Sequence, residues 1–245
     1  MTRTPHYSKA PITEAIIEIR WQLKAGTTLA DFERIHEAEK GTYPAVRKRL
    51  QALGLMELGP RVTASASQEQ TAFLYISADE KQIYQARLDG FAFSRLAPYE
   101  SWQPFQAEAR RLWNIHREAL KPVAITRLAV RYINRLDLPG ERVEMKDYFR
   151  LSPEVPPELP QSMSGFLLRV QLPQEDLKAQ LVVNQTIIPP VKPQSVAVIL
   201  DLDLFRDNDV PNDDNDIWAF FESLHERKNE VFENCITNPT RELIR

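Results

Sequence analysis

The stretch ITRLAVRYINRLDL, residues Ile125–Leu138, separates into two rows when every second residue is read. A β-strand points successive side chains to opposite faces of its sheet, so each row belongs to one face. One row is mostly apolar, which predicts a half-buried strand. The other row carries Arg127, Arg131 and Arg135, followed by Asp137. The fold must therefore bury the first row and give the arginines of the second row a partner.

Two kinds of partner are open to these arginines, and an extended anion is the first. Arg127 and Arg135 lie eight positions apart, which is roughly 27 Å of extended chain, so they form a row and not a cluster. A guanidinium bonds phosphate and carboxylate oxygens in pairs, so a nucleic-acid strand could lie along the row. Tyr132 and Asn134, from the same stretch, would complete that candidate binding site.

Carboxylates elsewhere in the chain are the second kind of partner. The polar faces of two other alternating stretches carry them: Glu14 and Glu18 in one, Asp201 and Asp203 in the other. If these stretches neighbour the arginine strand in a sheet, opposite charges face each other as a ladder. The net charge of −3, from 31 basic and 34 acidic residues, favours the ladder over a nucleic-acid groove.

The composition is that of an ordinary globular protein. The chain has 245 residues, of which 43% are hydrophobic and 27% charged, enough for one large domain or two small ones with a buried core. Its one cysteine, Cys235, allows no intramolecular disulfide and is compatible with a reducing compartment. No apolar run approaches the ~18 residues of a membrane span, and the N-terminus lacks the apolar core of a secretory signal. We therefore expect a cytoplasmic protein that does not associate with membranes.

Strands arrive in runs along the first half of the chain. Alternation predicts strands over 14–23, 71–78, 82–88 and 91–96, and helical spacing predicts helices over 27–41, 43–54 and 102–120. The stretch 54–70 is rich in small and polar residues and is expected to be mainly loop. Asp89-Gly90 predicts a two-residue hairpin turn. The register of that hairpin gives one face that we expect in the core: Tyr84, Ala86, Leu88, Phe91 and Phe93.

The second half of the chain follows a similar plan. Strands are predicted over 125–138, 166–172, 179–188 and 195–205, and a long helix with an acidic first turn over 213–236. Because strands come in runs and do not alternate with helices, the sequence predicts an α+β fold and not a doubly wound parallel sheet. We expect two similar halves, residues 1–120 and 121–245, that form antiparallel sheet covered by amphipathic helices. One continuous domain is the alternative to two separate ones.

The sequence contains none of the common nucleotide-binding or hydrolase motifs. It has no G-x-x-x-x-G-K-[ST], no G-x-G-x-x-G, no G-x-S-x-G and no H-E-x-x-H. Cys235 falls on a helical pattern, where a packed thiol is its expected role. No cofactor, metal or catalytic residue is therefore expected. The acidic stretch 201–216 could hold a divalent cation, although a solvated loop followed by a helix cap is favoured.

Four stretches of the chain carry a resemblance to a known family. They are KAPITEAIIEI (9–19), LAPYESWQPFQAEARRLW (96–113), RLAVRYINRLDLPG (127–140) and LHERKNEVFENCIT (224–237). Through them the chain resembles, over nearly its whole length, a sporadically distributed bacterial protein family of unknown function. The resemblance implies no activity and no catalytic residue, because none is established for that family. Its sporadic distribution implies a mobile or defence-type locus, similar to a toxin–antitoxin locus.

Three functions are compatible with these observations. We favour a non-catalytic binding or regulatory protein that acts through a protein partner or a second copy of itself. The reasons are the missing catalytic motifs and two amphipathic helices that carry Trp102, Trp113 and Trp218. The alternative is a ligand- or nucleic-acid-binding module that uses the arginine row. The third is a metal-dependent hydrolase built from the carboxylates Glu14, Glu18, Asp201 or Asp203.

Overall fold

The computed structural model describes residues 7–57, 63–161 and 163–245. Its nine described strands form one antiparallel sheet in the order β2-β3-β4-β5-β1-β6-β9-β8-β7. They are β1 (Ile12–Gln22), β2 (Ala45–Glu57), β3 (Thr63–Ile76), β4 (Gln82–Arg87), β5 (Gly90–Leu96), β6 (Ala124–Pro139), β7 (Leu167–Gln174), β8 (Ala179–Ile188) and β9 (Ser195–Arg206). The described helices are α1 (Leu29–His36), α2 (Trp102–Leu120), α3 (Met145–Tyr148), α4 (Asp214–Cys235) and α5 (Asn238–Leu243). The predicted α+β fold, antiparallel sheet with helices, is confirmed.

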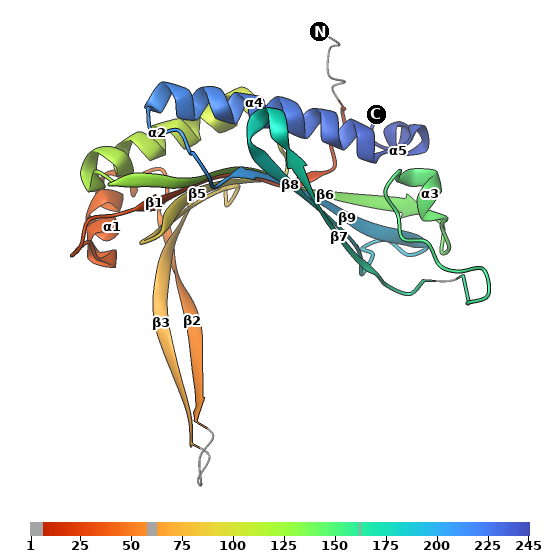
Figure 1. Ribbon diagram of the computed structural model, residues 1–245, viewed down its shortest axis with the longest axis horizontal. Coiled ribbons are helices and arrows are strands. Elements are labelled where there is room, and N and C mark those ends of the chain that lie inside the picture. The colour runs from red at the N-terminus through yellow and green to blue at the C-terminus, as the bar shows by residue number, and fades with distance from the viewer. Residues whose placement is uncertain (1–6, 58–62, 162) are drawn as a thin grey trace.

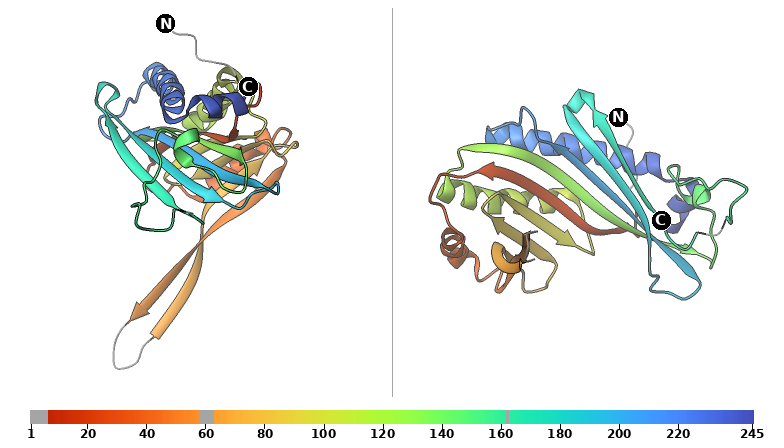
Figure 2. Two further views of the ribbon diagram at one scale, coloured as in Figure 1. Left: turned by 90° about the vertical axis from the view of Figure 1, so that its right-hand side faces the viewer. Right: turned by 60° about the horizontal axis from the view of Figure 1, so that its bottom comes forward.

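The sheet is arched, and its two faces differ (Figure 1). Helices α2 and α4 cover the convex side, whereas the hairpin of β2 and β3 projects from the concave side. Turned by 90°, the same helices and hairpin lie on opposite sides of the sheet (Figure 2). We call the side covered by α2 and α4 the helix face, and the side that bears Arg127, Arg131 and Arg135 the open face.

The apolar row of the opening stretch lies on the helix face. Leu128, Val130, Tyr132, Leu136 and Leu138 of β6 are each at most 2% exposed. They share one core with the buried row of the neighbouring strand β1: Ala15, Ile17, Ile19 and Trp21. Since side chains alternate along a strand, burial of these rows places the charged rows of β1 and β6 on the open face.

Helices α2 and α4 run side by side in opposite directions. Trp102, at the start of α2, donates its indole N–H to Glu222 of α4. Arg117, near the end of α2, pairs with Asp214 at the start of α4. Asp213 caps α4 through its carboxylate, as the acidic opening of that helix predicts. The predicted apolar stripe of α2 is buried: Phe105, Ala109, Leu112 and His116. None of the helices described here is both long enough and apolar enough to span a membrane.

Two predictions for the first half are wrong. The stretch 43–54, predicted as helix, lies almost wholly in strand β2, and much of the predicted loop 54–70 belongs to the β2–β3 hairpin. Residues 58–62 lie outside the described part of the chain. Lysine, arginine, leucine and alanine favour helix locally in this stretch. Backbone pairing with β3 all the way from Ala45 to Glu57 overrides that weak preference.

The predicted hairpin is present between β4 and β5, but its two turn residues are Leu88 and Asp89 and not Asp89 and Gly90, because Gly90 pairs with Arg87 as the first residue of β5. Its expected core face is buried at Tyr84, Ala86, Phe91 and Phe93. Leu88 differs from the prediction, since it is 42% exposed. It lies in the turn just beyond the end of β4, where its carbonyl oxygen accepts a hydrogen bond from the Trp21 indole at 3.1 Å.

Candidate ligand-binding cavity

The arginine row meets carboxylates across the open face. Arg131 and Asp201, on the paired strands β6 and β9, form a bidentate contact. Arg131 Nε donates to Asp201 Oδ1 at 2.8 Å, and Nη2 donates to Oδ2 at 2.7 Å. Asp201 is 5% exposed and accepts a further hydrogen bond from Asn184 of β8 at 3.0 Å. The buried carboxylate is thereby partnered at both oxygens, as a buried charge requires.

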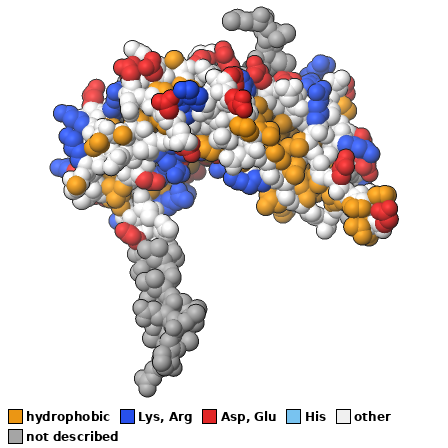
Figure 3. Space-filling view, viewed as in Figure 1, with side chains coloured by type: hydrophobic (Ala, Val, Ile, Leu, Met, Phe, Trp, Pro, Cys, Tyr) orange, Lys and Arg blue, Asp and Glu red, His pale blue; other side chains and the backbone are white. Residues whose placement is uncertain are grey.

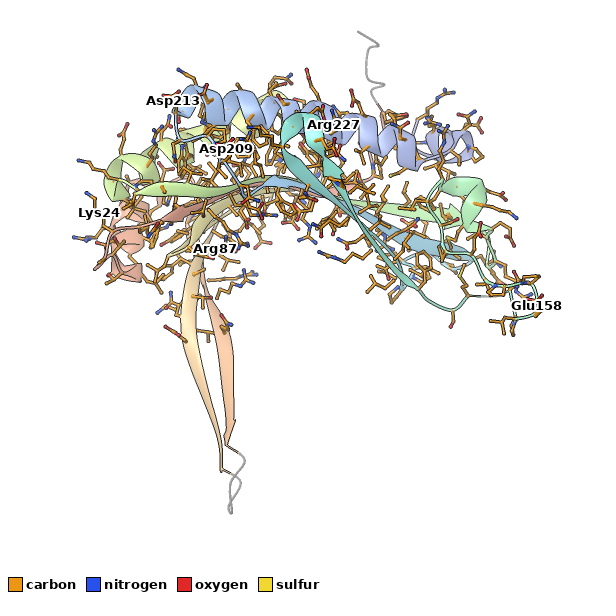
Figure 4. All side chains as sticks on the ribbon, viewed as in Figure 1. Lys24, Arg87, Glu158, Asp209, Asp213 and Arg227 are labelled. Atoms are coloured by element: carbon orange, nitrogen blue, oxygen red, sulfur yellow. The ribbon has the colours of Figure 1, made fainter. Side chains whose placement is uncertain are left out.

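Arg127 links three strands of the same face. It donates to Glu18 of β1 and, at 3.1 Å, to Asp203 of β9. Arg87 of β4 donates to the other carboxylate oxygen of Glu18 at 3.1 Å, and Figure 4 labels Arg87 on the concave side. Burial raises the pKa of Glu18, but Arg127 and Arg87 outweigh burial and hold that pKa below its usual value. At Asp203 burial prevails, and the pKa is raised despite Arg127.

The remaining charges of the open face are arranged more loosely. Arg135 pairs at 3.0 Å with Asp137, two positions further along the same strand. Asp201 and, more weakly, Glu14 raise the pKa of Arg131. Figure 3 shows basic side chains on the concave side of the arch. The open face is therefore a network of alternating charges, in which the arginines of the row already have carboxylate partners.

The described residues contain no group of three or more His, Cys, Asp or Glu side chains placed to hold a metal ion. The carboxylates Glu18, Asp201 and Asp203, which the sequence offers to a hydrolase, are bound by arginines. Burial raises the pKa of Cys235 to about 11, so this side chain is a protonated thiol at neutral pH.

A cavity of about 1180 Å³ opens on the helix face. Its walls come from segment 7–12, the loop 97–101, the first residues of α2, the later part of α4, and Asn134 of β6. Aromatic side chains and carboxylates both line it: Tyr7, Tyr99, Trp102, Phe232, Glu222, Glu226 and Glu233. The walls therefore offer a small molecule both apolar contacts and hydrogen-bonding groups.

Lys228 of α4 lines this cavity and is only 6% exposed. Its Nζ lies 4.0 Å from the centroid of the Tyr132 ring and donates to Asn229 Oδ1 at 2.5 Å. Burial lowers the pKa of Lys228 to about 7. A large fraction of this amine is therefore neutral at physiological pH, whereas a surface lysine is almost wholly protonated.

His225 lies one helical turn before Lys228, and its ring packs against that of Trp102 beside the cavity. The two rings are stacked, with centroids 4.3 Å apart and 3° between their planes. Trp102 is fixed by its indole N–H, which donates to Glu222 Oε2 at 2.6 Å. Burial, together with the charge of Lys228, lowers the pKa of His225 to about 3, so its ring is neutral at pH 7.

A chain of hydrogen bonds connects the amine to the cavity wall. Asn229 accepts from Lys228 and donates through Nδ2 to His225 Nε2 at 3.3 Å. The neutral ring of His225 then carries its proton on Nδ1, which lies 3.4 Å from the Tyr132 hydroxyl. The hydroxyl of the fully buried Tyr132 lies 3.2 Å from that of Tyr99, which lines the cavity. Five side chains thus form one continuous polar network.

The five binding candidates from the opening stretch do not share one face of the sheet. Arg127, Arg131 and Arg135 lie on the open face, whereas Tyr132 and Asn134 lie on the helix face and are 0% and 2% exposed. Asn134 lines the cavity and donates to a backbone carbonyl of β9 at 3.0 Å. Alternation along the strand separates the two groups, so only the last two residues can belong to the cavity.

Sequence reasoning missed the residues of α4 that build the cavity, above all Lys228. A signal for it was present, because the buried positions of α4 recur at helical spacing and Lys228 occupies one of them, between Leu224 and Phe232. Lysine is almost never fully buried unless it is paired. Tyr99 and Trp102 gave no comparable signal, since a loop and a helix start bring them to the cavity.

All four stretches that carry the family resemblance supply residues to this cavity. They contribute Pro11 and Ile12, Tyr99 and Trp102, Asn134, and His225 and Lys228. Neither a scan against protein-family models nor a search of curated proteins finds a match for the chain. What the cavity can bind therefore has to follow from its own side chains.

Proposed function

We propose that the protein is a non-catalytic binding or regulatory protein whose ligand is a small organic molecule held in the helix-face cavity. The cavity is the observation that carries this proposal, because about 1180 Å³ accommodates a drug-sized molecule. Trp102 and Phe232 of the lining offer it apolar contacts. Tyr99 and Asn134 offer polar contacts from other directions.

The charges of the open face support the cavity over the arginine row as the binding site. Arg127 and Arg131 already bond carboxylates of β1 and β9. An anionic ligand would have to displace those carboxylates, of which Asp201 is buried. The net charge of −3 adds long-range repulsion toward a nucleic acid.

The tryptophans that motivated a protein partner are buried. Trp102, Trp113 and Trp218 are 3%, 0% and 4% exposed. Aromatic residues strengthen a protein interface when a partner can cover them, and these side chains are covered within the chain. A protein partner and a mobile or defence-type locus stay predictions from the sequence, and the proposed ligand is a small molecule.

We also propose that the two predicted halves are structural repeats that meet at this cavity. Their first strands, β1 and β6, pair antiparallel at the centre of the sheet. Outward from β1 the strands are β5, β4 and β3, with β2 as an additional edge strand, and outward from β6 they are β9, β8 and β7. Each half thus adds its strands in the same order and ends in a long helix, α2 or α4. Both helices contribute to the cavity wall.

Dye binding to two matched variants tests the proposed site. Glu226 lines the cavity, and Glu230 is an exposed residue one turn further along α4. Glu226→Trp should weaken binding of the neutral dye Nile red at least about tenfold, because the indole occupies space that the dye needs and tenfold requires only about 1.4 kcal/mol. Glu230→Trp makes the same exchange outside the cavity and should leave the affinity unchanged. Fluorescence titration measures both dissociation constants.

The unsubstituted protein should bind about one dye per chain in a saturable manner, since one cavity carries the proposal. Equal affinity of both variants would place the dye elsewhere and contradict the proposed site. Absence of saturable binding to the unsubstituted protein would contradict the proposed function itself.

A further inference from the structure

Lys228 places a buried amine at the cavity wall. A cavity that bound its ligand through apolar contacts alone would not need this amine. We propose that Lys228 Nζ forms an imine with an uncharged aldehyde or ketone held in the cavity. The inference rests on the proposed function, because the ligand must first enter the cavity, and it adds the chemical class of that ligand. Imine formation is reversible in water, so it is a mode of binding and needs no catalytic step beyond it.

The surroundings of Lys228 favour the neutral, reactive form of its amine. Its Nζ contacts the Asn229 amide oxygen and the Tyr132 ring, and both groups carry no charge. Burial raises the pKa of both Tyr132 and Tyr99, so these hydroxyls stay protonated at neutral pH. His225 on the same helix is neutral as well. The carboxylates of the cavity lining form no ion pair with Lys228 in the described part of the chain, and burial lowers the pKa of Lys228 to about 7.

The reaction balances without a further reactant. The lone pair of the neutral amine forms a bond to the carbonyl carbon, and the π electrons of the carbonyl move to its oxygen. Proton transfer gives a carbinolamine. The oxygen then leaves as water together with both hydrogens of the amine, and a carbon–nitrogen double bond remains. No atom is oxidised or reduced, and water regenerates the free amine by the reverse path.

The cavity wall defines the rest of the ligand. Glu222, Glu226 and Glu233 line the cavity and repel a phosphate or carboxylate group on a ligand. Aromatic side chains of the lining, among them Tyr7, Trp102 and Phe232, suit an aromatic or other apolar group. The matching class is an apolar carbonyl compound without negative charge, and aromatic aldehydes are its simplest members.

Reductive trapping tests the inference directly. The protein of residues 1–245 is incubated at pH 7 with 2-naphthaldehyde and sodium cyanoborohydride, which converts an imine into a stable secondary amine. Intact mass should show one adduct per chain, and peptide mapping should place it on Lys228. Labelling of Lys228 should exceed that of any exposed lysine at least about tenfold, because an ordinary lysine with a pKa near 10.4 is almost wholly protonated at this pH.

Two variants and a charged probe sharpen this test. Lys228→Met should lose the adduct, whereas Lys24→Met, which removes an exposed lysine, should keep it. The anionic aldehyde 4-formylbenzoate should label Lys228 at least about tenfold more slowly than 2-naphthaldehyde. Adducts spread over exposed lysines with none on Lys228 would overturn the inference, and this map of the unsubstituted protein does not depend on how a variant folds.

An alcohol of the same shape separates failure of the inference from failure of the proposed function. 2-Naphthalenemethanol cannot form an imine but can enter the cavity and displace Nile red. Displacement by the alcohol, without any adduct on Lys228 from the aldehyde, would overturn imine formation and leave the cavity as a binding site. Failure of both compounds to displace the dye, again with no adduct, would count against the cavity as well.

Discussion

At the scale of single residues, Lys228 is the clearest case of a side chain whose burial costs folding free energy while it lines the proposed binding site. An ammonium group loses its hydration when it is buried, and a neighbouring carboxylate normally compensates for that loss. Lys228 has the uncharged Asn229 and the ring of Tyr132 instead, and it releases its proton more readily. Groups with strongly shifted pKa values in a cavity gather at functional sites, which is why the proposal centres on this side chain.

The lowered pKa of Lys228 makes stability depend on pH in a predictable direction. The pKa is about 7 in the folded chain and near 10.4 in the unfolded chain, so the unfolded chain binds more protons between these pH values. The free energy of unfolding therefore rises with pH in this window, by up to about 1.4 kcal/mol per pH unit from this group. Lys228→Met, which does not titrate, should exceed the unsubstituted protein in stability at pH 7, and the gap should shrink toward pH 10.

Urea denaturation of the two proteins at pH 7, 8 and 9 measures that gap. Lys24→Met is the control, because Lys24 is exposed and points outward at the end of the arch (Figure 4). Its difference from the unsubstituted protein should stay constant over the same range. A constant difference for Lys228→Met as well would show that its amine is not buried as described.

At the scale of elements, the pair of Arg131 and Asp201 connects β6 to β9. Arg131→Ala leaves the carboxylate of Asp201, 5% exposed, without its guanidinium. We expect a loss of about 1–2 kcal/mol in the free energy of unfolding. Breaking a fully buried pair costs more, but the side chain of Arg131 is 44% exposed and water screens part of the interaction.

Arg135→Ala is the matched control for Arg131→Ala, because it removes another arginine of the same row on β6. The partner of Arg135 is Asp137, which lies on the same strand, so this contact does not connect β6 to a neighbouring strand. It should contribute less than about 0.5 kcal/mol to the free energy of unfolding. Urea denaturation of both variants gives the two losses. An Arg131→Ala protein as stable as the unsubstituted one would contradict a structural role for the arginine row.

The elements that the sequence predicted well are those with one buried face. In β1, β6 and α2 burial on one side imposes alternation or helical spacing, and the pattern reports the structure. Strand β2 fails this condition because it lies at the edge of the sheet, where Val46 and Leu50 are 47% and 55% exposed. Residues 45–51 of β2 are all exposed and form no buried row, so this part of the sequence carries only local preferences, and these favour a helix.

At the scale of the whole molecule, contacts between distant segments build the site. Tyr7 donates to Glu233 at 2.7 Å and thereby joins the N-terminal segment to α4 across 226 positions of sequence. The loop 97–101 reaches the same place between β5 and α2. Periodicity reports which face of an element is buried but not which segments meet over it. The ladder partners could be proposed from the alternating charged rows of single strands. Predicting the cavity would have required knowledge of which distant segments meet over the helix face.

The central claim is that a ligand enters the helix-face cavity, and the four tryptophans of the chain allow a direct measurement. All four indoles pack in the core, but only Trp102 also lines the cavity among the residues described there. Indole ¹⁵N–¹H signals, assigned with Trp102→Phe, are followed by NMR during titration with 2-naphthalenemethanol. The account predicts a saturable shift of the Trp102 signal that is larger than the shifts of the other three. A saturating titration that leaves the Trp102 signal in place while another indole signal moves would contradict it.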